Sequence, residues 1–500
     1  MQRLTGLDAT FLYLETSTTH MHVSSVLIVD PSTAPRAFGF DEYRKLLSDR
    51  LHLAPPWRRR LVEVPFGLHH PLWIEDPDFD LDYHLRRAAL PAPGGINELA
   101  SFAAEFHSRP LDRKRPLWEL YVVEGLEGGK VAIVGKTHHA AIDGVSGAEL
   151  TVALLDLTPE VAEVTPAPWV PDRVPSDFEL VSYAASSLAR QPLAAMQAAR
   201  RTAEMALNLR RRNRQPDVEP PPAPFAAPKT SVNAPITAHR LFTMADVSLL
   251  DVKRVKNAFG CTVNDVILAL CAGALRKYFE ALDEEVSTDL VAMIPISVRT
   301  EDEAGTMGNK VSGMLSSLAT TVADPGERLA TIALGTRRAK EQDKAVSADV
   351  LSDWTEFMAP AVAARAARLA SATRVLDRLN PIFNVVISNV PGPNIPLYSC
   401  GAELQAMYPM GPITDGAGLN ITVFSYRDNV HFGLVACRET VPGVAKFAGF
   451  LQESLDELVK LAGERGGDIV DLASKGQPKG AAAAIKAPAR KAAKKAAAPG

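Results

Sequence analysis

The sequence lacks the features of a secreted or membrane-spanning protein. It has four cysteines in 500 residues, and they form no C-x-x-C pair and no disulfide-like spacing. This usage suits a reducing compartment. No apolar run approaches the about 20 residues that span a bilayer, and no basic region followed by an apolar block indicates a signal peptide. We therefore expect a cytoplasmic protein and, for any membrane or lipid-inclusion contact, a peripheral one.

Common signatures of covalent catalysis are missing as well. There is no Gly-x-Ser-x-Gly nucleophile elbow, and no cysteine falls in a recognisable Cys/His signature. The sequence therefore does not predict a covalent enzyme intermediate.

The charge is negative and unevenly distributed. The net charge is −4, although the last 29 residues after Asp471 contain lysine and arginine and no acid. The body of the chain is consequently more acidic than the total, which argues against general nucleic-acid binding. A polyanionic ligand would need a local basic patch.

Composition and proline placement divide the chain into two folded blocks. The length suits two domains or more, and the 47% hydrophobic and 22% charged residues suit a globular protein. Residues 1–158 and 236–465 have mixed α and β patterns, so we predict an α/β fold of the mixed, α+β kind. The linker between them, 159–235, holds 13 of the 37 prolines. Residues 472–500, rich in Ala, Lys, Gly and Pro, predict a disordered basic tail.

The linker contains one helix-compatible stretch, Ser176–Arg214, with a probable kink at Pro192. Its leucines, methionines and many arginines suit an amphipathic helix on an anionic membrane. They equally suit a helix packed across the two domains with a solvated polar face.

Periodicity predicts the main elements of both blocks. Helices are expected at 40–53, 96–107, 145–157, 262–282, 327–340 and 442–462. Strands are expected at 131–134, 289–298, 311–318, 383–388, 419–426 and 430–437, and the alternating residues 79–85 are expected to lead into another. Thr262 can cap its helix, which places Asn264 in the first turn.

The reactive candidate is the stretch Thr137-His138-His139-Ala140-Ala141-Ile142-Asp143-Gly144, between an expected strand and an expected helix. Adjacent residues of an extended chain point to opposite faces, so the two histidines cannot address one substrate atom together. The face of His138 carries Lys130 and Lys136, whereas the face of His139 carries no charge. His139 is therefore the better candidate for a secluded site. Asp143 can turn back to fix the local geometry, and Gly144 permits unusual backbone angles.

Other interpretations of these residues stay open. A lone histidine is usually a surface or satisfied core residue, and a His-His pair near an Asp could be a metal site, although opposed side chains argue against it. A second pair, His69-His70, lacks the following Asp-Gly. The basic run Arg58-Arg59-Arg60 is either a solvated face or a binding site, and Trp118 is more typical of a core or tunnel wall.

His-His-x-x-x-Asp-Gly resembles the signature of coenzyme-A-dependent acyltransferases, a superfamily that includes chloramphenicol acetyltransferase and peptide-synthetase condensation domains. Four flanking blocks are similar to the bacterial wax ester synthase/diacylglycerol acyltransferase family. They are Leu7-Asp8-Ala9-Thr10-Phe11-Leu12-Tyr13-Leu14-Glu15, Arg115-Pro116-Leu117-Trp118-Glu119, Val263-Asn264-Asp265-Val266 and Ser388-Asn389-Val390-Pro391-Gly392-Pro393.

The resemblance implies two chloramphenicol-acetyltransferase-like domains with the active-site channel between them. It implies direct transfer of a long-chain acyl group from acyl-CoA, a co-substrate, to diacylglycerol or a long-chain alcohol, with no bound cofactor and no metal. His139 would be the general base, His138 and Asp143 organisers, Gly144 the turn residue, and Asn264 a contributor to the oxyanion site. The alternatives are a condensation-type enzyme that uses a carrier protein and a non-catalytic lipid-binding paralogue.

Overall fold

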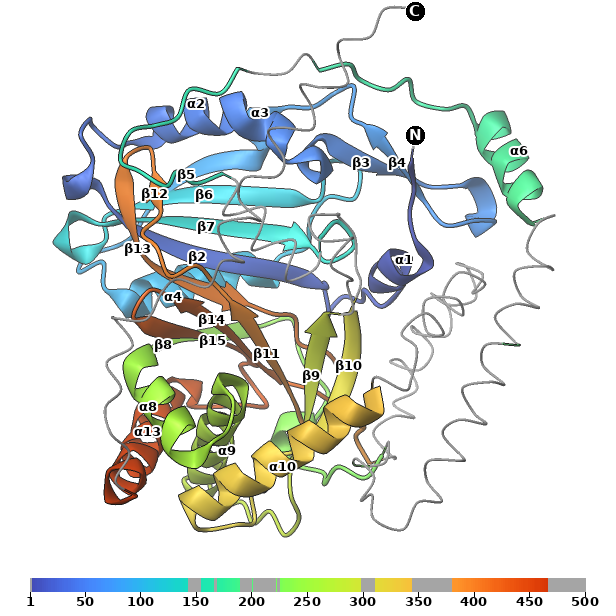
Figure 1. Cartoon of the computed structure of the whole chain (residues 1–500). Helices are drawn as coiled ribbons and strands as arrows, with labels where there is room; N and C mark the ends of the chain where they lie inside the picture. The colour runs from blue at the N-terminus through green and yellow to red at the C-terminus, as the bar shows by residue number, and fades with distance from the viewer. Residues whose placement is uncertain are drawn as a thin grey trace, which may run out of the picture.

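The computed structural model describes residues 2–142, 154–165, 169–188, 200, 222, 225–297, 311–343 and 380–465. Within them two six-stranded sheets form the framework, one above the other in Figure 1. A three-stranded sheet of β1 (Gln2–Arg3), β4 (Leu72–Glu75) and β3 (Arg59–Val62) lies beside the first large sheet. The chain is thus a mixed α/β protein, as the sequence predicted.

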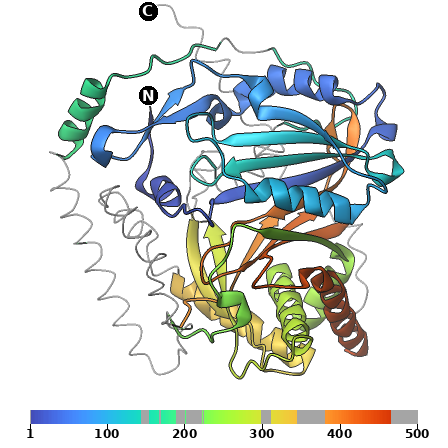
Figure 2. The same cartoon turned by 180° about the vertical axis from the view of Figure 1, so that it is seen from behind.

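The first large sheet carries the histidine motif. Its strands, in spatial order, are β12 (Tyr398–Ser399), β13 (Ala402–Met410), β2 (His22–Asp30), β7 (Val131–His138), β6 (Trp118–Glu124) and β5 (Leu85–Ala89). Helix α2 (Phe40–Arg50) packs its buried residues on the core of one face. Helix α4 (Ile96–Ser108) covers the other face and also packs on the edge of the second sheet (Figure 2). The central strands are thereby buried on both sides.

The second sheet is covered by helices on its far side. Its order is β10 (Val311–Ser317), β9 (Val291–Ser297), β11 (Val385–Pro391), β14 (Leu419–Tyr426), β15 (Asn429–Cys437) and β8 (Arg240–Ser248). The helices are α8 (Leu249–Phe259), α9 (Val263–Glu280), α10 (Pro325–Asp343) and α13 (Phe447–Glu464). Their apolar faces and the sheet enclose one continuous core. The other face is left to meet the first domain.

A strand from the second half of the chain completes the first sheet. β13 pairs antiparallel with β2, with Met407 opposite Leu27. The division of the sequence at residue 236 assigns 402–410 to the second block, and no local pattern shows that they cross to the first. Because β13 also packs on β14 and β15, this crossing ties the two sheets together.

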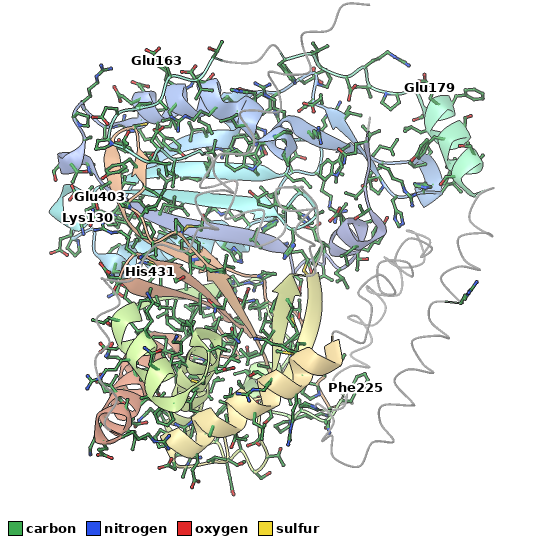
Figure 3. The ribbon with its side chains drawn as sticks, in the orientation of Figure 1. Lys130, Glu163, Glu179, Phe225, Glu403 and His431 are labelled. Carbon is green, nitrogen blue, oxygen red and sulfur yellow. The ribbon has the colours of Figure 1, made fainter. Side chains whose placement is uncertain are left out.

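Helix α6 (Asp177–Leu188) lies on one flank, against the hairpin that β3 and β4 form (Figure 3, with Glu179 marking the helix). It is the described part of the stretch 176–214. Of the rest of that stretch the structure describes only residues 176 and 200, so most of the arginine-rich segment and its expected kink at Pro192 lie outside the described residues.

Most expected elements are confirmed where the structure describes them. α9 begins with a capping box in which Thr262 and Asp265 bond each other's backbone amides, and β14 and β15 form the expected hairpin. Residues 79–85 do lead into a strand, as expected, although the residues before it are not extended throughout. Asp80 caps a helical turn, α3 (Leu81–His84), and the strand begins only at Leu85. The helix expected at 145–157 falls largely outside the described residues.

The short helix α1 (Gly6–Tyr13) precedes the first long strand and lies next to the end of β7 (Figure 1). Thr5 caps it by accepting a hydrogen bond from the amide of Asp8. The helix brings Phe11 and, two residues past its end, Glu15 toward the two histidines.

Candidate active site

The two histidines end a fully buried strand. Every residue of β7 is buried, and the amide of His138 donates to the carbonyl of Leu117 at 2.9 Å. The amide of His139 then donates to the carbonyl of Met21 on the other side, at 2.9 Å. This pairing holds both residues in the extended geometry that directs their side chains to opposite faces. Asp143 and Gly144 lie outside the described residues.

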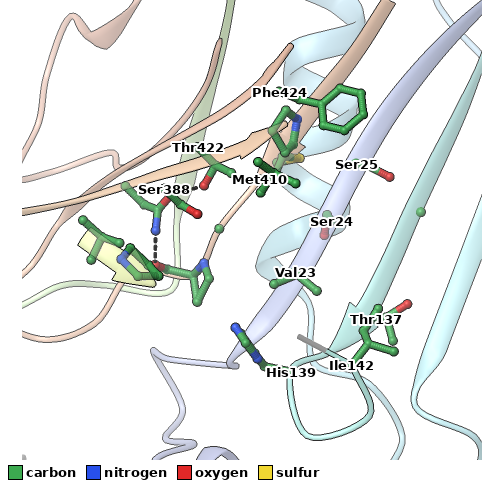
Figure 4. Close-up of a pocket in the computed structure, with 18 of the residues that line it drawn as sticks. Val23, Ser24, Ser25, Thr137, His139, Ile142, Ser388, Met410, Thr422 and Phe424 are labelled. Carbon is green, nitrogen blue, oxygen red and sulfur yellow. Dashed lines mark hydrogen bonds between the residues drawn. The ribbon is translucent and has the colours of Figure 1, made fainter. Parts of the chain in front are cut away.

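His139 lines a cavity of about 750 Å³ between the two sheets. Thr137, Gly135 and Ile133, on the same face of β7, line it too, and neither His138 nor Lys136 does. Figure 4 shows His139 on one side of this cavity and Ser388 and Thr422 of the second domain across from it. The alternation read from the sequence thus describes the two faces of β7 as the structure has them.

The ring of His139 is held by Phe11. Their centroids are 4.2 Å apart and the planes differ by 8°, a stacked pair. His139 is half-buried, so one side of the imidazole is covered by an apolar ring. The stacking restricts the rotation of the imidazole without taking up its nitrogens.

His138 is buried on the other face, and its hydrogen bonds define its tautomer. The amide of Ala140 donates to Nδ1 at 2.9 Å. Because an amide can only donate, Nδ1 carries no proton, and the proton of the neutral ring is on Nε2. Nε2 lies 3.1 Å from Oε1 of Glu15 and donates to it. His138 therefore fixes the turn after β7.

Glu15 is in turn held by Arg113. Arg113 Nε donates to Glu15 Oε2 at 2.7 Å, and its Nη2 donates to the carbonyl of Leu12 at 2.6 Å. Burial raises the pKa of Glu15, but the hydrogen bonds from His138 and Arg113 and the positive charge of Arg113 together outweigh it, so the net pKa of Glu15 is lowered. Glu15 is thus a carboxylate that connects α1 to the histidine turn.

This arrangement predicts a pH-dependent stability. A carboxyl with a lowered folded pKa stabilises the fold above its unfolded pKa, about 4.3, and that contribution is lost as pH falls through the folded pKa. Glu15→Gln should therefore lower the free energy of unfolding at pH 7 by about 1–3 kcal/mol. The difference from the wild type should shrink as the pH falls below 4.

Urea unfolding of the wild type and of Glu15→Gln, at pH 7 and below pH 4, measures this difference in the free energy of unfolding. Glu105→Gln is the matched control, because the Arg109–Glu105 pair is exposed, at 65% and 67% of the side chains, and exposed pairs contribute little. If Glu15→Gln lowers the free energy of unfolding no more than the control does, the contacts of Glu15 with His138 and Arg113 do not stabilise the fold as predicted.

A polar layer lies on the other face of β7, between this strand and α4. Lys136 donates to the carbonyls of Phe106 and Arg109 at 3.1 and 2.9 Å, and burial lowers its pKa to about 8. His22, opposite His138 across the strands, and His107 are buried, and burial lowers the pKa of each well below its ordinary value. These histidines are therefore neutral at pH 7, which avoids further positive charge beside Lys136.

Asn264 does not line the cavity itself but contacts Asn389, which does. It is in the first turn of α9, and its Oδ1 accepts a hydrogen bond of 3.4 Å from Asn389 Nδ2. Asn389, at the end of β11, lines the cavity, whereas Asn264 does not. Asp265, the neighbour of Asn264, caps α9 and accepts from Thr336 at 2.6 Å. Asn389 belongs to the Ser-Asn-Val-Pro-Gly-Pro block, and that block was the available signal for it.

The other residues singled out in the sequence make contacts that are typical of structural residues. Arg59 and Arg60 form ion pairs with Glu75 and Asp76 at 2.8 and 2.9 Å. Trp118 is a core residue, stacked on Trp57 with centroids 4.4 Å apart. His70, in the second histidine pair, is buried and its Nδ1 lies 2.8 Å from the hydroxyl of Tyr13.

The described part of the chain shows no candidate metal site and no single helix that could span a membrane. Among its residues no group of three or more His, Cys, Asp or Glu side chains could hold a metal ion. No single described helix is long and apolar enough to cross a membrane, and only α8 and α9, bent by 105° at their junction, pass by length and composition as a pair.

The two stacked sheets with a histidine strand facing the cavity between them define the architecture of chloramphenicol-acetyltransferase-like proteins. The starter condensation domain of rhizomide synthetase superposes with a TM-score of 0.53 over 94% of this chain and 96% of that chain. At 13% identity this likeness shows the shared fold.

Sequence comparison narrows the class to one family. The wax ester synthase/diacylglycerol acyltransferase catalytic domain matches residues 4–267, and the C-terminal domain of the same family matches residues 307–459. The wax ester synthase/diacylglycerol acyltransferase of Marinobacter aquaeolei VT8 is 32% identical, with a TM-score of 0.65 over 93% of this chain and 100% of that one. A Mycobacterium tuberculosis H37Rv protein named as a probable diacylglycerol O-acyltransferase is 36% identical over 91% of this chain and 98% of its own length. The chain belongs to the wax ester synthase/diacylglycerol acyltransferase family and is an acyl-CoA-dependent acyltransferase.

Proposed function

We propose that the protein transfers a long-chain acyl group from acyl-CoA to the hydroxyl of diacylglycerol or of a long-chain alcohol, with His139 as the general base. The observation that carries this proposal is the position of His139 in the wall of an interdomain cavity lined mainly by apolar side chains. Such walls suit alkyl chains, and an imidazole can accept a proton near neutral pH.

The transfer needs one proton acceptor that later becomes a donor. The acceptor oxygen attacks the thioester carbonyl carbon, a C–O bond forms, and the hydroxyl proton passes to a ring nitrogen of His139. The tetrahedral intermediate then collapses, the C–S bond breaks, and the imidazolium returns the proton to the departing thiolate. The products are an ester and free coenzyme A, and His139 regains its initial state.

His138 acts on His139 from outside the cavity. His138, bonded to Ala140 and Glu15, holds the turn that presents His139. Asp143 is proposed as a second organiser of that turn, and Gly144 as the residue that permits it.

Stabilisation of the oxyanion is proposed for the Asn264–Asn389 pair. Preorganised amide donors that face developing negative charge contribute strongly to acyl transfer. Asn389 lines the cavity and Asn264 accepts from its amide, so Asn389 would donate to the oxyanion and Asn264 would orient it. This modifies the expectation that Asn264 itself meets the substrate.

The activity is tested with purified protein, labelled palmitoyl-CoA, and either diacylglycerol or hexadecanol as acceptor. We expect labelled triacylglycerol or wax ester on a thin-layer plate, and no product without acceptor. Release of free fatty acid alone, with both acceptors present, would contradict the transferase proposal.

We also propose peripheral contact with a lipid surface through the flank that α6 and the β3–β4 hairpin form. At the hairpin tip Phe66 has 89% of its surface exposed, and on α6 Phe178 has 82% exposed. Phe66 also has a positive φ of 60°, a strained position for a bulky residue. Two exposed aromatic rings on one flank are typical of side chains that enter a lipid interface.

Replacing both rings should weaken vesicle binding. Each phenylalanine moved from water into an apolar layer contributes up to about 1.5–3 kcal/mol, so Phe66→Ser with Phe178→Ser should reduce the fraction that sediments with phosphatidylglycerol vesicles by about tenfold or more. Leu250→Ser is the control, because Leu250 is 62% exposed but lies on α8. Equal losses in the double variant and the control would exclude this flank as the contact.

A separate prediction concerns membrane binding by the arginine-rich part of 176–214. It should favour anionic over neutral vesicles, and salt should weaken the preference.

A further inference from the structure

One branch of the cavity lining follows β7 away from His139 and reaches Tyr43 of α2. Three residues of β7 line it on the same face as His139 and lie progressively farther from that histidine: Thr137, Gly135 and Ile133. From His139 to Ile133 the strand advances six residues, or about 20 Å. The walls are completed by buried side chains of the first domain, namely Leu27, Tyr43, Trp57, Leu120 and Leu154. We call this branch the N-terminal arm.

The wall residues of the N-terminal arm suit a single alkyl chain. None of its wall residues is charged, and burial raises the pKa of Tyr43, so its hydroxyl stays neutral. The other branch, the interdomain arm, is lined by Ser388, Asn389, Thr414, Asn420 and Thr422 among apolar residues. Hydroxyl and amide groups suit a substrate with ester or hydroxyl groups of its own, such as diacylglycerol. A fatty acyl chain has none beyond its thioester.

Gly135 lies in the wall of the N-terminal arm between two neighbouring strands. It is opposite Ser25 on one side and Leu120 on the other. A Cβ added at Gly135 would lie 2.6 Å from Leu120 Cδ2 and 3.9 Å from Ser25 Oγ. Gly135 is not among the glycines with positive φ, so the backbone does not require glycine there. A glycine inside a strand costs stability and often marks the close approach of a ligand.

We propose that the N-terminal arm binds the alkyl chain of the acyl thioester, and that Gly135 determines the longest chain it admits. This inference rests on the proposed function, because it takes an acyl-CoA as the ligand. The carbonyl carbon lies near His139, and the chain extends past Gly135 toward Ile133. The interdomain arm is then left to the acceptor.

The test compares Gly135→Val with the wild type on octanoyl-CoA and palmitoyl-CoA, at one fixed acceptor. Two quantities are measured for each thioester, the binding affinity by calorimetry and kcat/KM for transfer. In the wild type we expect palmitoyl-CoA to bind more tightly, because each further methylene that leaves water tightens binding. In Gly135→Val the preference for palmitoyl-CoA should fall by tenfold or more, with octanoyl-CoA little affected.

Two further variants separate chain exclusion from general damage. Gly313 lines the interdomain arm, and a Cβ added there would meet only Met293, with Sδ at an ordinary 3.6 Å. Gly313→Ala should therefore leave the preference for palmitoyl-CoA unchanged. Ser25→Val narrows the N-terminal arm from the neighbouring strand without the Leu120 contact, and should reproduce the Gly135→Val shift if Gly135→Val does not fold.

The outcomes distinguish this inference from the proposed function. Absence of transfer in the wild type, with a binding preference that Gly135→Val removes, would refute the activity and retain the arm. Normal transfer with an unchanged preference in both Gly135→Val and Ser25→Val would overturn the arm assignment. A shift of the preference by Gly313→Ala as large as that by Gly135→Val would overturn it as well.

Discussion

His139→Ala is expected to slow the chemical step of acyl transfer by about two to four orders of magnitude, the usual contribution of a general base. The substitution removes the imidazole in the cavity wall and leaves the hydroxyl of the acceptor without a proton acceptor. Affinity for acyl-CoA should change little, because the acyl chain is bound mainly by the apolar wall residues of the N-terminal arm. Single-turnover transfer, together with acyl-CoA binding by calorimetry, measures the two effects separately.

Stability provides the internal control for that experiment. The side chain of His139 contacts Phe11 at the cavity edge and is half-buried, so the melting temperature of His139→Ala should stay close to that of the wild type. Near-normal transfer by this variant would exclude His139 as the base and return the role to another group.

His138→Ala is expected to lower both stability and rate. The substitution leaves the amide of Ala140 without its acceptor and Glu15 without the Nε2–H donor, and both groups are buried or nearly so. Buried groups left unpaired cost about 1–3 kcal/mol each. The turn after β7 would then be less well held, and the position of His139 with it.

The conservative variant His138→Asn separates positioning from chemistry. An asparagine can replace one of the two hydrogen bonds, so it should recover part of the melting temperature and, with it, part of the rate. A thermal melt beside single-turnover transfer checks whether the two recover together. If His138→Ala melts normally and is inactive while His139→Ala is active, the roles of the two histidines are reversed.

Much of the site could be predicted because short-range rules governed it. Alternation along an extended chain placed His138 and His139 on opposite faces, and the uncharged face of His139 proved to be the one that lines the cavity. Thr262 and Asp265 are three residues apart, so the capping box of α9 was visible in the sequence. Local turns were less certain, and the helical turn at 81–84 shows how an N-cap aspartate interrupts an alternating pattern.

Other parts of the site depended on contacts between distant segments. Glu15 is 123 residues from its partner His138, and nothing near either residue indicates the other. Asn389, not Asn264, lines the cavity, and the hydrogen bond between them joins residues 125 positions apart in the sequence.

The sequence by itself determined the family, the two α/β blocks and the faces of the histidine strand, because motifs, composition and alternation act over a few residues. Only the tertiary structure decided that β13 joins the first sheet, that Glu15, paired with Arg113, bonds His138, and that Gly135 lines the cavity beside Leu120. The reason is physical. Strand pairing, buried ion pairs and cavity walls are made by segments that meet only after the chain has folded, and their free energies depend on partners that local patterns do not contain.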